Sequence, residues 1–172
     1  MKSSMKKAAL VILLLAGFFT VHAQRDISYD TTAPYRHHPA IPDFKLLQPD
    51  STWFNSADLP KNKHVVIVYF NPDCGHCQQE AKSMIEHKSE LTNGAFVFVS
   101  YHNPQQIGEF VKEYKLKELA YVVAGRDTQY YIPSFFRIKF TPFVAVYDKK
   151  GNLQKTFEGG AEIDALKKEL SL

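Results

Sequence analysis

The chain has 172 residues and is 45% hydrophobic, which fits one domain with a sizeable core, and it contains only two cysteines. It carries 21 basic and 18 acidic residues, but three of the basic ones are Lys2, Lys6 and Lys7 at the extreme amino terminus. Residues 24–172 therefore balance to zero formal charge, and nothing in the composition indicates a nucleic-acid or anionic-membrane partner.

Residues 1–23 are predicted to be a signal peptide that is cleaved after Ala23. The lysines precede an apolar run from Ala8 to Phe19, and the small-x-small pattern "VHA" follows. This run is shorter than the roughly 20 residues that span a bilayer, so a retained anchor is the less favoured alternative. No cysteine lies near the cleavage site, which excludes a lipid anchor there. The chain is expected to be periplasmic or otherwise exported, without a membrane span after cleavage.

Residues 24–40 are polar and lack a hydrophobic period, so a linker or N-terminal arm is expected before a domain at 41–172. The apolar, β-branched run at 64–70 predicts a strand buried on both faces, and helical periodicity then extends from Cys74 to "NG" at 93–94. The other expected elements are a strand at 95–101, a helix after Asn103 and Pro104, a strand at 119–124, a short helix from about Pro133, a hairpin of strands at 142–148 and 153–159, and a C-terminal amphipathic helix. This order predicts a mixed-sheet α/β domain with helices on both faces.

The two cysteines, Cys74 and Cys77, stand where the buried strand gives way to the helix. The first residues of a helix present unpaired N–H groups and about half a positive charge, so a thiolate at Cys74 is favoured and its pKa is expected to fall. Cys77 lies one turn further along the helix, where the field is weaker and the side chain is more shielded. We therefore expect Cys74 to be the exposed nucleophile and Cys77 to resolve mixed disulfides.

Three titratable neighbours modify this expectation. A protonated His76 favours the thiolate, whereas the charge of Asp73 opposes it unless that carboxylate caps the helix. Glu80 lies three residues after Cys77 and therefore on the same helix face. A half-buried Glu80 would have a raised pKa and would relay a proton to or from Cys77, whereas the alternative is an ordinary solvated carboxylate.

Other uses of the cysteine pair fit the sequence less well. Covalent haem attachment needs Cys-x-x-Cys-His, and residue 78 is glutamine. Zinc needs about four ligands, and no second cluster has ligand-like spacing, so no metal site is expected. A structural disulfide across so short a loop would add little stability. A redox couple that needs no cofactor is the favoured interpretation.

A second signal is Thr141–Pro142 in "KFTPFVAVYD", directly before a predicted strand. The segments "IPDFKLL", "VVIVYFNPDCGHCQQE" and "FTPFVAVYDKKGNL" resemble, in this order, parts of the exported thioredoxin-like redoxins of the TlpA/ResA type. The C-terminal helix completes the resemblance, which covers residues 41–172.

The resemblance implies a thioredoxin-like three-layer fold, in which helices flank a central mixed β-sheet, and a thiol–disulfide oxidoreductase with a Cys74–Cys77 disulfide. It also implies that Thr141–Pro142 is cis, packs against this disulfide and binds substrate through the backbone of Thr141, and it supports a catalytic role for Glu80. The implied partners are cysteine-containing exported proteins and a redox partner protein. The alternative is a thioredoxin-fold module that binds a partner or a metal without catalysis.

The chain departs from the family pattern at several positions. Asp73 replaces the tryptophan before the first cysteine, Gly-His separates the two cysteines, and Val68 stands where thioredoxin has a buried acid. The Thr-x-x-Cys pattern of peroxiredoxins, which share the fold, is absent. These differences concern the redox potential and the partner rather than the fold.

Overall fold

The computed structural model describes residues 32–171, so the predicted signal peptide and its cleavage site lie outside the described residues. The described residues form a seven-stranded mixed sheet in the order β2-β1-β5-β4-β3-β6-β7. The strands are β1 (Lys45–Leu47), β2 (Trp53–Asn55), β3 (His64–Tyr69), β4 (Gly94–Ser100), β5 (Val122–Arg126), β6 (Phe143–Tyr147) and β7 (Leu153–Glu158).

Strand β3 lies in the interior of the sheet and leads directly to the two cysteines. It pairs in parallel with β4 and antiparallel with β6, so that Val66 lies opposite both Phe96 and Val146. All of its residues are buried. The continuous apolar run of β3 follows from this position, because a strand covered on both faces has no solvent side for polar residues.

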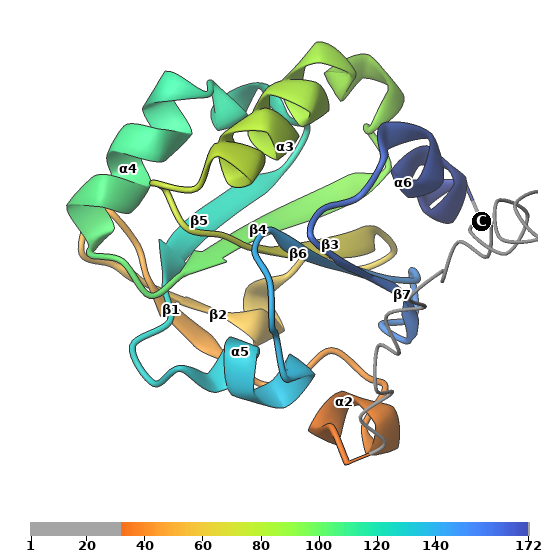
Figure 1. Ribbon diagram of the computed structural model, residues 1–172. Coiled ribbons are helices and arrows are strands. Elements are labelled where there is room, and N and C mark those ends of the chain that lie inside the picture. Colours follow the sequence, from red (N-terminus) through yellow and green to blue (C-terminus); the bar gives the residue numbers. More distant parts are fainter. Residues whose placement is uncertain (1–31, 172) are drawn as a thin grey trace, which may run out of the picture. The chain divides into compact units, whose positions relative to one another are not determined.

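Helices cover both faces of the sheet. They are α2 (Pro34–His37), α3 (Gly75–Glu86), α4 (Pro104–Glu113), α5 (Tyr131–Phe136) and α6 (Ile163–Leu170), with short 3-10 helices η2 (Ser56–Asp58), η3 (Lys88–Glu90) and η4 (Leu116–Glu118). In Figure 1, α3, α4 and α6 lie on one side of the sheet, and α5 and α2 on the other. Two hydrophobic clusters match these layers: one includes Val68 and Met84, and the other includes Ile67 and Ile132. The predicted mixed-sheet, three-layer α/β arrangement is thus confirmed.

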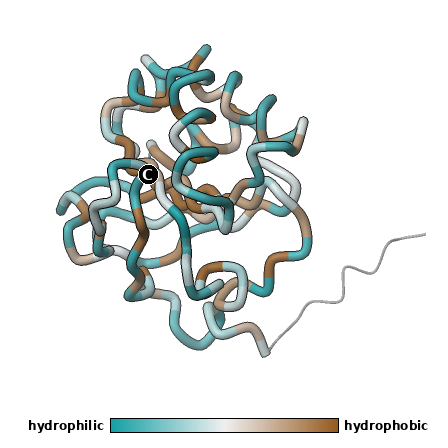
Figure 2. The backbone as a smooth tube through the Cα atoms, turned by 90° about the vertical axis from the view of Figure 1, so that its left-hand side faces the viewer, coloured by the Kyte–Doolittle hydropathy of each residue, from teal (hydrophilic) through white to brown (hydrophobic). Residues whose placement is uncertain are grey.

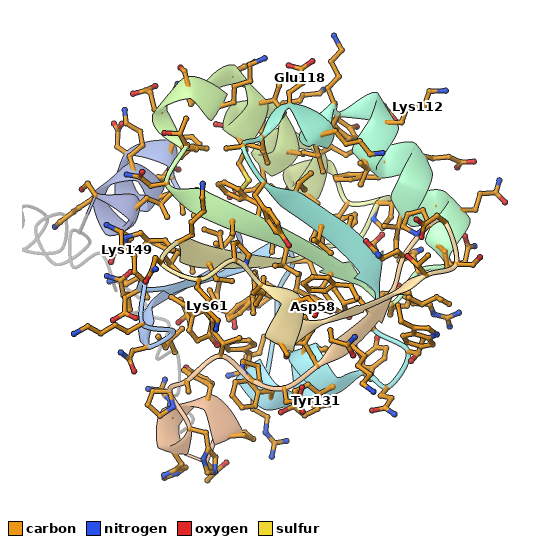
Figure 3. The ribbon with its side chains drawn as sticks, turned by 180° about the vertical axis from the view of Figure 1, so that it is seen from behind. Asp58, Lys61, Lys112, Glu118, Tyr131 and Lys149 are labelled. Atoms are coloured by element: carbon orange, nitrogen blue, oxygen red, sulfur yellow. The ribbon has the colours of Figure 1, made fainter. Side chains whose placement is uncertain are left out.

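Hydropathy follows this layering. The most hydrophobic stretches of backbone run through the middle of the domain, whereas the helices alternate between hydrophobic and hydrophilic positions (Figure 2). Charged side chains such as those of Lys112 and Glu118 are exposed and point outward (Figure 3). Within residues 32–171, no helix combines the length and the hydrophobicity needed to cross a bilayer.

The ends of two predicted helices differ from the observed ones. Helix α3 ends at Glu86 rather than at "NG", because the chain tightens into η3 directly afterwards. Helix α5 begins at Tyr131 rather than near Pro133. The carboxylate of Asp127 accepts a hydrogen bond from the Ile132 N–H at 2.8 Å, and this contact stabilises the earlier start.

Strand β5 occupies residues 122–126 instead of 119–124. Strand β2 was not predicted, because three residues are too few to reveal alternation; it pairs antiparallel with β1. Part of the expected arm packs on the domain. Ala33 is buried, and the ring centroid of Tyr35 lies 5.4 Å from that of Phe136.

Candidate active site

A turn between β3 and α3 places Cys74 at the N-cap of the helix. The side-chain oxygen of Asn71 accepts a hydrogen bond from the Asp73 N–H at 2.8 Å, and the Asn71 carbonyl accepts one from the Cys74 N–H at 3.1 Å. Cys74 thus adjoins the free N–H groups of the first helical turn. Asp73 is exposed and does not cap the helix, so solvent weakens the effect of its charge on Cys74.

The sulfur of Cys74 is half-buried and contacts the second sequence signal. Its thiol donates a hydrogen bond to the carbonyl oxygen of Thr141, with an S–O distance of 3.7 Å. Partial burial acts to raise the pKa of Cys74, but hydrogen bonds with the Cys77 N–H, the Cys77 thiol and the Thr141 hydroxyl outweigh it, and the pKa lies below the ordinary thiol value. Cys74 therefore combines access to solvent with a favoured thiolate.

Cys77 differs from Cys74 in both its burial and its thiol pKa. Its side chain is 2% exposed, and its sulfur accepts a hydrogen bond from the Asn71 N–H at 3.5 Å. Burial raises the pKa of Cys77 to about 12. Both cysteines are free thiols in this structure. The pair thus consists of one accessible, acidic thiol and one shielded, weakly acidic thiol.

Strand pairing explains why Thr141 and Pro142 lie beside the cysteines. Strand β6 runs antiparallel to β3, and Phe143 at its start lies opposite Tyr69 at the end of β3. The residues before β6 therefore lie beside the residues after β3, at the same end of these two strands. The Thr141–Pro142 peptide bond is cis, and Pro142 is buried.

Glu80 lies on the buried side of α3, with 9% of its surface exposed. Both carboxylate oxygens accept the N–H of Ala161, each at 3.2 Å. Burial raises the pKa of Glu80 to about 7; the Ala161 hydrogen bond opposes this rise, and the charge of Glu162 adds to it. The carboxylate is therefore not an ordinary solvated one, and its hydrogen bonds go to Ala161 rather than to Cys77.

The loop between β7 and α6 was not predicted to take part in the site. Gly160 in this loop is so close to Glu80 and Pro142 that an added Cβ would lie 2.8 Å from Glu80 Oε2 and 3.4 Å from Pro142 Cγ. The sequence signal available for this loop was the "GG" pair at 159–160. His76, by contrast, is exposed. Among residues 32–171, no three His, Cys, Asp or Glu side chains are grouped closely enough to hold a metal ion.

The chain is similar to one protein family and to several solved structures. A model described as the AhpC/TSA family matches residues 38–163. A search of curated proteins gives no significant match. Three solved structures with similar folds are DsbF of MTB (24% identity, TM-score 0.62, covering 74% of this chain and 92% of that one), a secreted Mycobacterium tuberculosis disulfide oxidoreductase homologous to E. coli DsbE (18%, 0.61, 74% and 94%) and copper-bound ScoI of Arabidopsis thaliana (16%, 0.60, 76% and 97%). These likenesses confirm the predicted thioredoxin-like fold.

Proposed function

The chain belongs to the AhpC/TSA family, and from that premise we propose that it is an exported thiol–disulfide oxidoreductase of the TlpA/ResA type. The observation that carries the proposal is the difference between the two sulfurs. Cys74 is accessible and has a lowered pKa, whereas Cys77 is buried and has a raised one. A nucleophile and a resolving thiol require this division of properties.

In the reductive direction, the Cys74 thiolate attacks one sulfur of a partner disulfide. The partner S–S bond breaks, a mixed disulfide forms, and the other partner sulfur leaves as a thiolate that takes up a proton. Cys77 then loses its proton and attacks the Cys74 sulfur, which releases the second partner thiol and leaves a Cys74–Cys77 disulfide. Two electrons pass to the partner, and the oxidative direction is the reverse of these steps.

Glu80 is proposed to accept the proton that Cys77 loses and to return it in the reverse direction. A carboxyl group with a pKa of about 7 changes its protonation state near neutral pH. The pKa of Cys77 is much higher, so its deprotonation needs a nearby acceptor. Because Glu80 makes no direct hydrogen bond to Cys77, transfer through a water molecule is the expected route.

Thr141 is proposed to bind the backbone of the partner. Among residues 32–171, the one hydrogen-bond donor to its carbonyl in the reduced protein is the weak S–H group of Cys74. Loss of the Cys74 proton frees this carbonyl to accept an N–H from an extended partner segment, which is a short form of β-augmentation. The proposed partners are cysteine-containing exported proteins and a redox partner protein, and export rests on the predicted signal peptide at residues 1–23.

The proposal can be tested by equilibrating the purified protein with mixtures of oxidised and reduced glutathione, followed by alkylation and mass spectrometry. We expect Cys74 and Cys77 to convert together from two thiols to one disulfide in a single two-electron transition. The protein should also catalyse the reduction of insulin by dithiothreitol, and Cys74→Ser should abolish this activity. Two thiols that never form the disulfide across the glutathione range would overturn the proposal.

A copper-binding module is the second candidate, because the ScoI structure holds copper and this chain presents two free thiols. The same preparation distinguishes the two candidates. An oxidoreductase should bind far less than one Cu(I) per chain in the presence of excess glutathione, and added Cu(I) should leave the alkylation of each thiol unchanged. Stoichiometric copper that protects both cysteines, together with no insulin reduction, would favour the metal-binding module.

A further inference from the structure

The loop between β7 and α6 contains two adjacent glycines with different surroundings. Gly159 and Gly160 both have positive φ angles, 83° and 112°, so a side chain at either position strains the backbone. A Cβ added at Gly159 would meet no atom within 4 Å. A Cβ added at Gly160 would lie 2.8 Å from Glu80 Oε2, which is too close for two non-bonded atoms. The volume that a side chain would need at position 160 is therefore occupied by the Glu80 carboxylate.

The backbone of the loop also binds the same carboxylate. The Ala161 N–H donates to both Glu80 oxygens at 3.2 Å, and Ala161 itself is buried. The ring of Pro142 borders the same space, since its Cγ would lie 3.4 Å from a Cβ at Gly160. Three segments thus meet around position 160: the dithiol helix α3 through Glu80, the start of β6 through Pro142, and the loop before α6.

We propose that Gly160 is a positioning residue: the missing side chain leaves room for the Glu80 carboxylate to accept the Ala161 N–H, beside the space that the Pro142 ring borders. This inference rests on the thiol–disulfide exchange proposed above, in which Glu80 accepts the proton of Cys77. Among residues 32–171, Glu162 of the same loop is the charged group that acts on the Glu80 carboxylate, and its charge disfavours ionisation. The Ala161 N–H favours ionisation. Burial raises the pKa of Glu80 most, and the position of the carboxylate relative to this loop modifies its protonation further.

Thermal stability tests the steric part of the proposal. Gly160→Ala and Gly159→Ala both place an alanine at a positive φ, but only the first brings a Cβ against Glu80. We expect Gly160→Ala to lower Tm by about 3–6 °C more than Gly159→Ala does. In a Glu80→Ala background the space is open, so this difference should shrink to about 2 °C or less. An unchanged difference in that background would overturn the proposal.

The pH profile of Cys77 reactivity tests the functional part. In a Cys74→Ser background, the rate of Cys77 alkylation is measured from pH 5 to pH 9, and only macroscopic midpoints are compared. Gly160→Ala displaces the carboxylate from the Ala161 N–H that favours its ionised form. The Glu80-dependent midpoint should therefore rise by about half a unit or more, while Gly159→Ala leaves it in place. The shift should disappear in a Glu80→Gln background, and a shift that persists there would contradict the proposal.

Three further outcomes remain decisive. If Gly160→Ala alone fails to fold, the double variant with Glu80→Ala should fold, because the clash is then removed. Failure of the double variant to fold overturns the proposal.

If the wild-type protein exchanges disulfides but the Tm effects of Gly160→Ala and Glu80→Ala are additive, the role of Gly160 is wrong and the proposed function stands. If the wild type exchanges no disulfides, the proposed function is wrong, and the Tm comparison still decides whether Gly160 positions Glu80.

Discussion

The sulfur of Cys74 lies 3.7 Å from the carbonyl oxygen of Thr141, which follows it by 67 positions in the chain. The pairing of β3 with β6 produces this contact, because it brings the end of one strand beside the start of the other. The atom proposed to attack and the backbone group proposed to bind the partner are thus fixed by one pair of neighbouring strands. A partner segment held at Thr141 would present its sulfur to Cys74 without any rearrangement of the sheet.

Phe140, next to Thr141, is expected to contact partner proteins. It is 65% exposed, and its N–H is held by the Glu158 carboxylate at 3.1 Å, so the aromatic side chain is presented on an anchored backbone. Phe140→Ala should slow the reduction of insulin by about two- to tenfold, the range expected for loss of an aromatic contact. Exchange with oxidised glutathione, which offers far less apolar surface to the ring than a protein does, should change less than about twofold.

Trp53→Ala is the matched control for Phe140→Ala, because Trp53 is similarly exposed but lies on the edge strand β2. It should leave both rates unchanged. Equal effects of Phe140→Ala on insulin and on glutathione would mean that Phe140 supports the thiols rather than the partner.

Glu80 should make the protein less stable as the pH rises through the neutral range. Burial raises its pKa to about 7 from an ordinary value of 4.5. Between these values the folded protein keeps a proton that the unfolded chain has released, so the free energy of unfolding falls by about 3 kcal/mol from pH 4.5 to pH 7 and above. The full stabilisation is present below pH 4.5. The side chain introduced by Glu80→Gln cannot ionise, so this variant should lack the decrease.

Urea denaturation from pH 4 to pH 8 measures this effect. The reference protein and its Glu80→Gln variant should both carry Cys74→Ser and Cys77→Ser, so that no thiol titrates. The difference in unfolding free energy between these two proteins cancels the contributions of all other groups, to the extent that they are independent. A constant difference across this range would show that Glu80 is not a buried acid with a raised pKa.

The start of helix α4 provides a test of local stability away from the site. The side chain of Asn103 accepts the Gln106 N–H at 2.9 Å and caps the helix, with Pro104 in the first turn. Asn103→Ala should lower the free energy of unfolding by about 1 kcal/mol. Gln105→Ala, on the exposed side of the same turn, should cost less than about 0.5 kcal/mol. Similar losses in the two variants, measured by urea denaturation, would contradict a capping role for Asn103.

Features that depend on neighbouring residues were predicted best from the sequence. The apolar run of β3 and the start of α3 are local signals, and Asn103 and Pro104 mark a helix start by their own chemistry. The placement of Cys74 at the start of the helix followed from these signals, and the structure shows that it is the N-cap residue. Strand β2 was missed because its stability comes from pairing with β1 and not from its own three residues.

The contacts of Glu80 could not be predicted in the same way. Its spacing from Cys77 suggested that it faces the dithiol, but its hydrogen-bond partner, Ala161, comes from a loop 81 positions away. The "GG" pair predicts positive φ angles in that loop and says nothing about which side chain fills the space beside it. Packing between distant segments decides this point, and a single sequence carries no record of it.

The central claim, that Cys74 attacks and Cys77 resolves, is tested most directly by single-cysteine variants incubated with oxidised glutathione at pH 7. Cys77→Ser retains the accessible, acidic thiol, and Cys74→Ser retains the buried one with a pKa of about 12. Mass spectrometry should detect the glutathione mixed disulfide in Cys77→Ser at least about tenfold faster than in Cys74→Ser, even though a less acidic thiolate is the stronger nucleophile. Equal rates of modification would contradict the account.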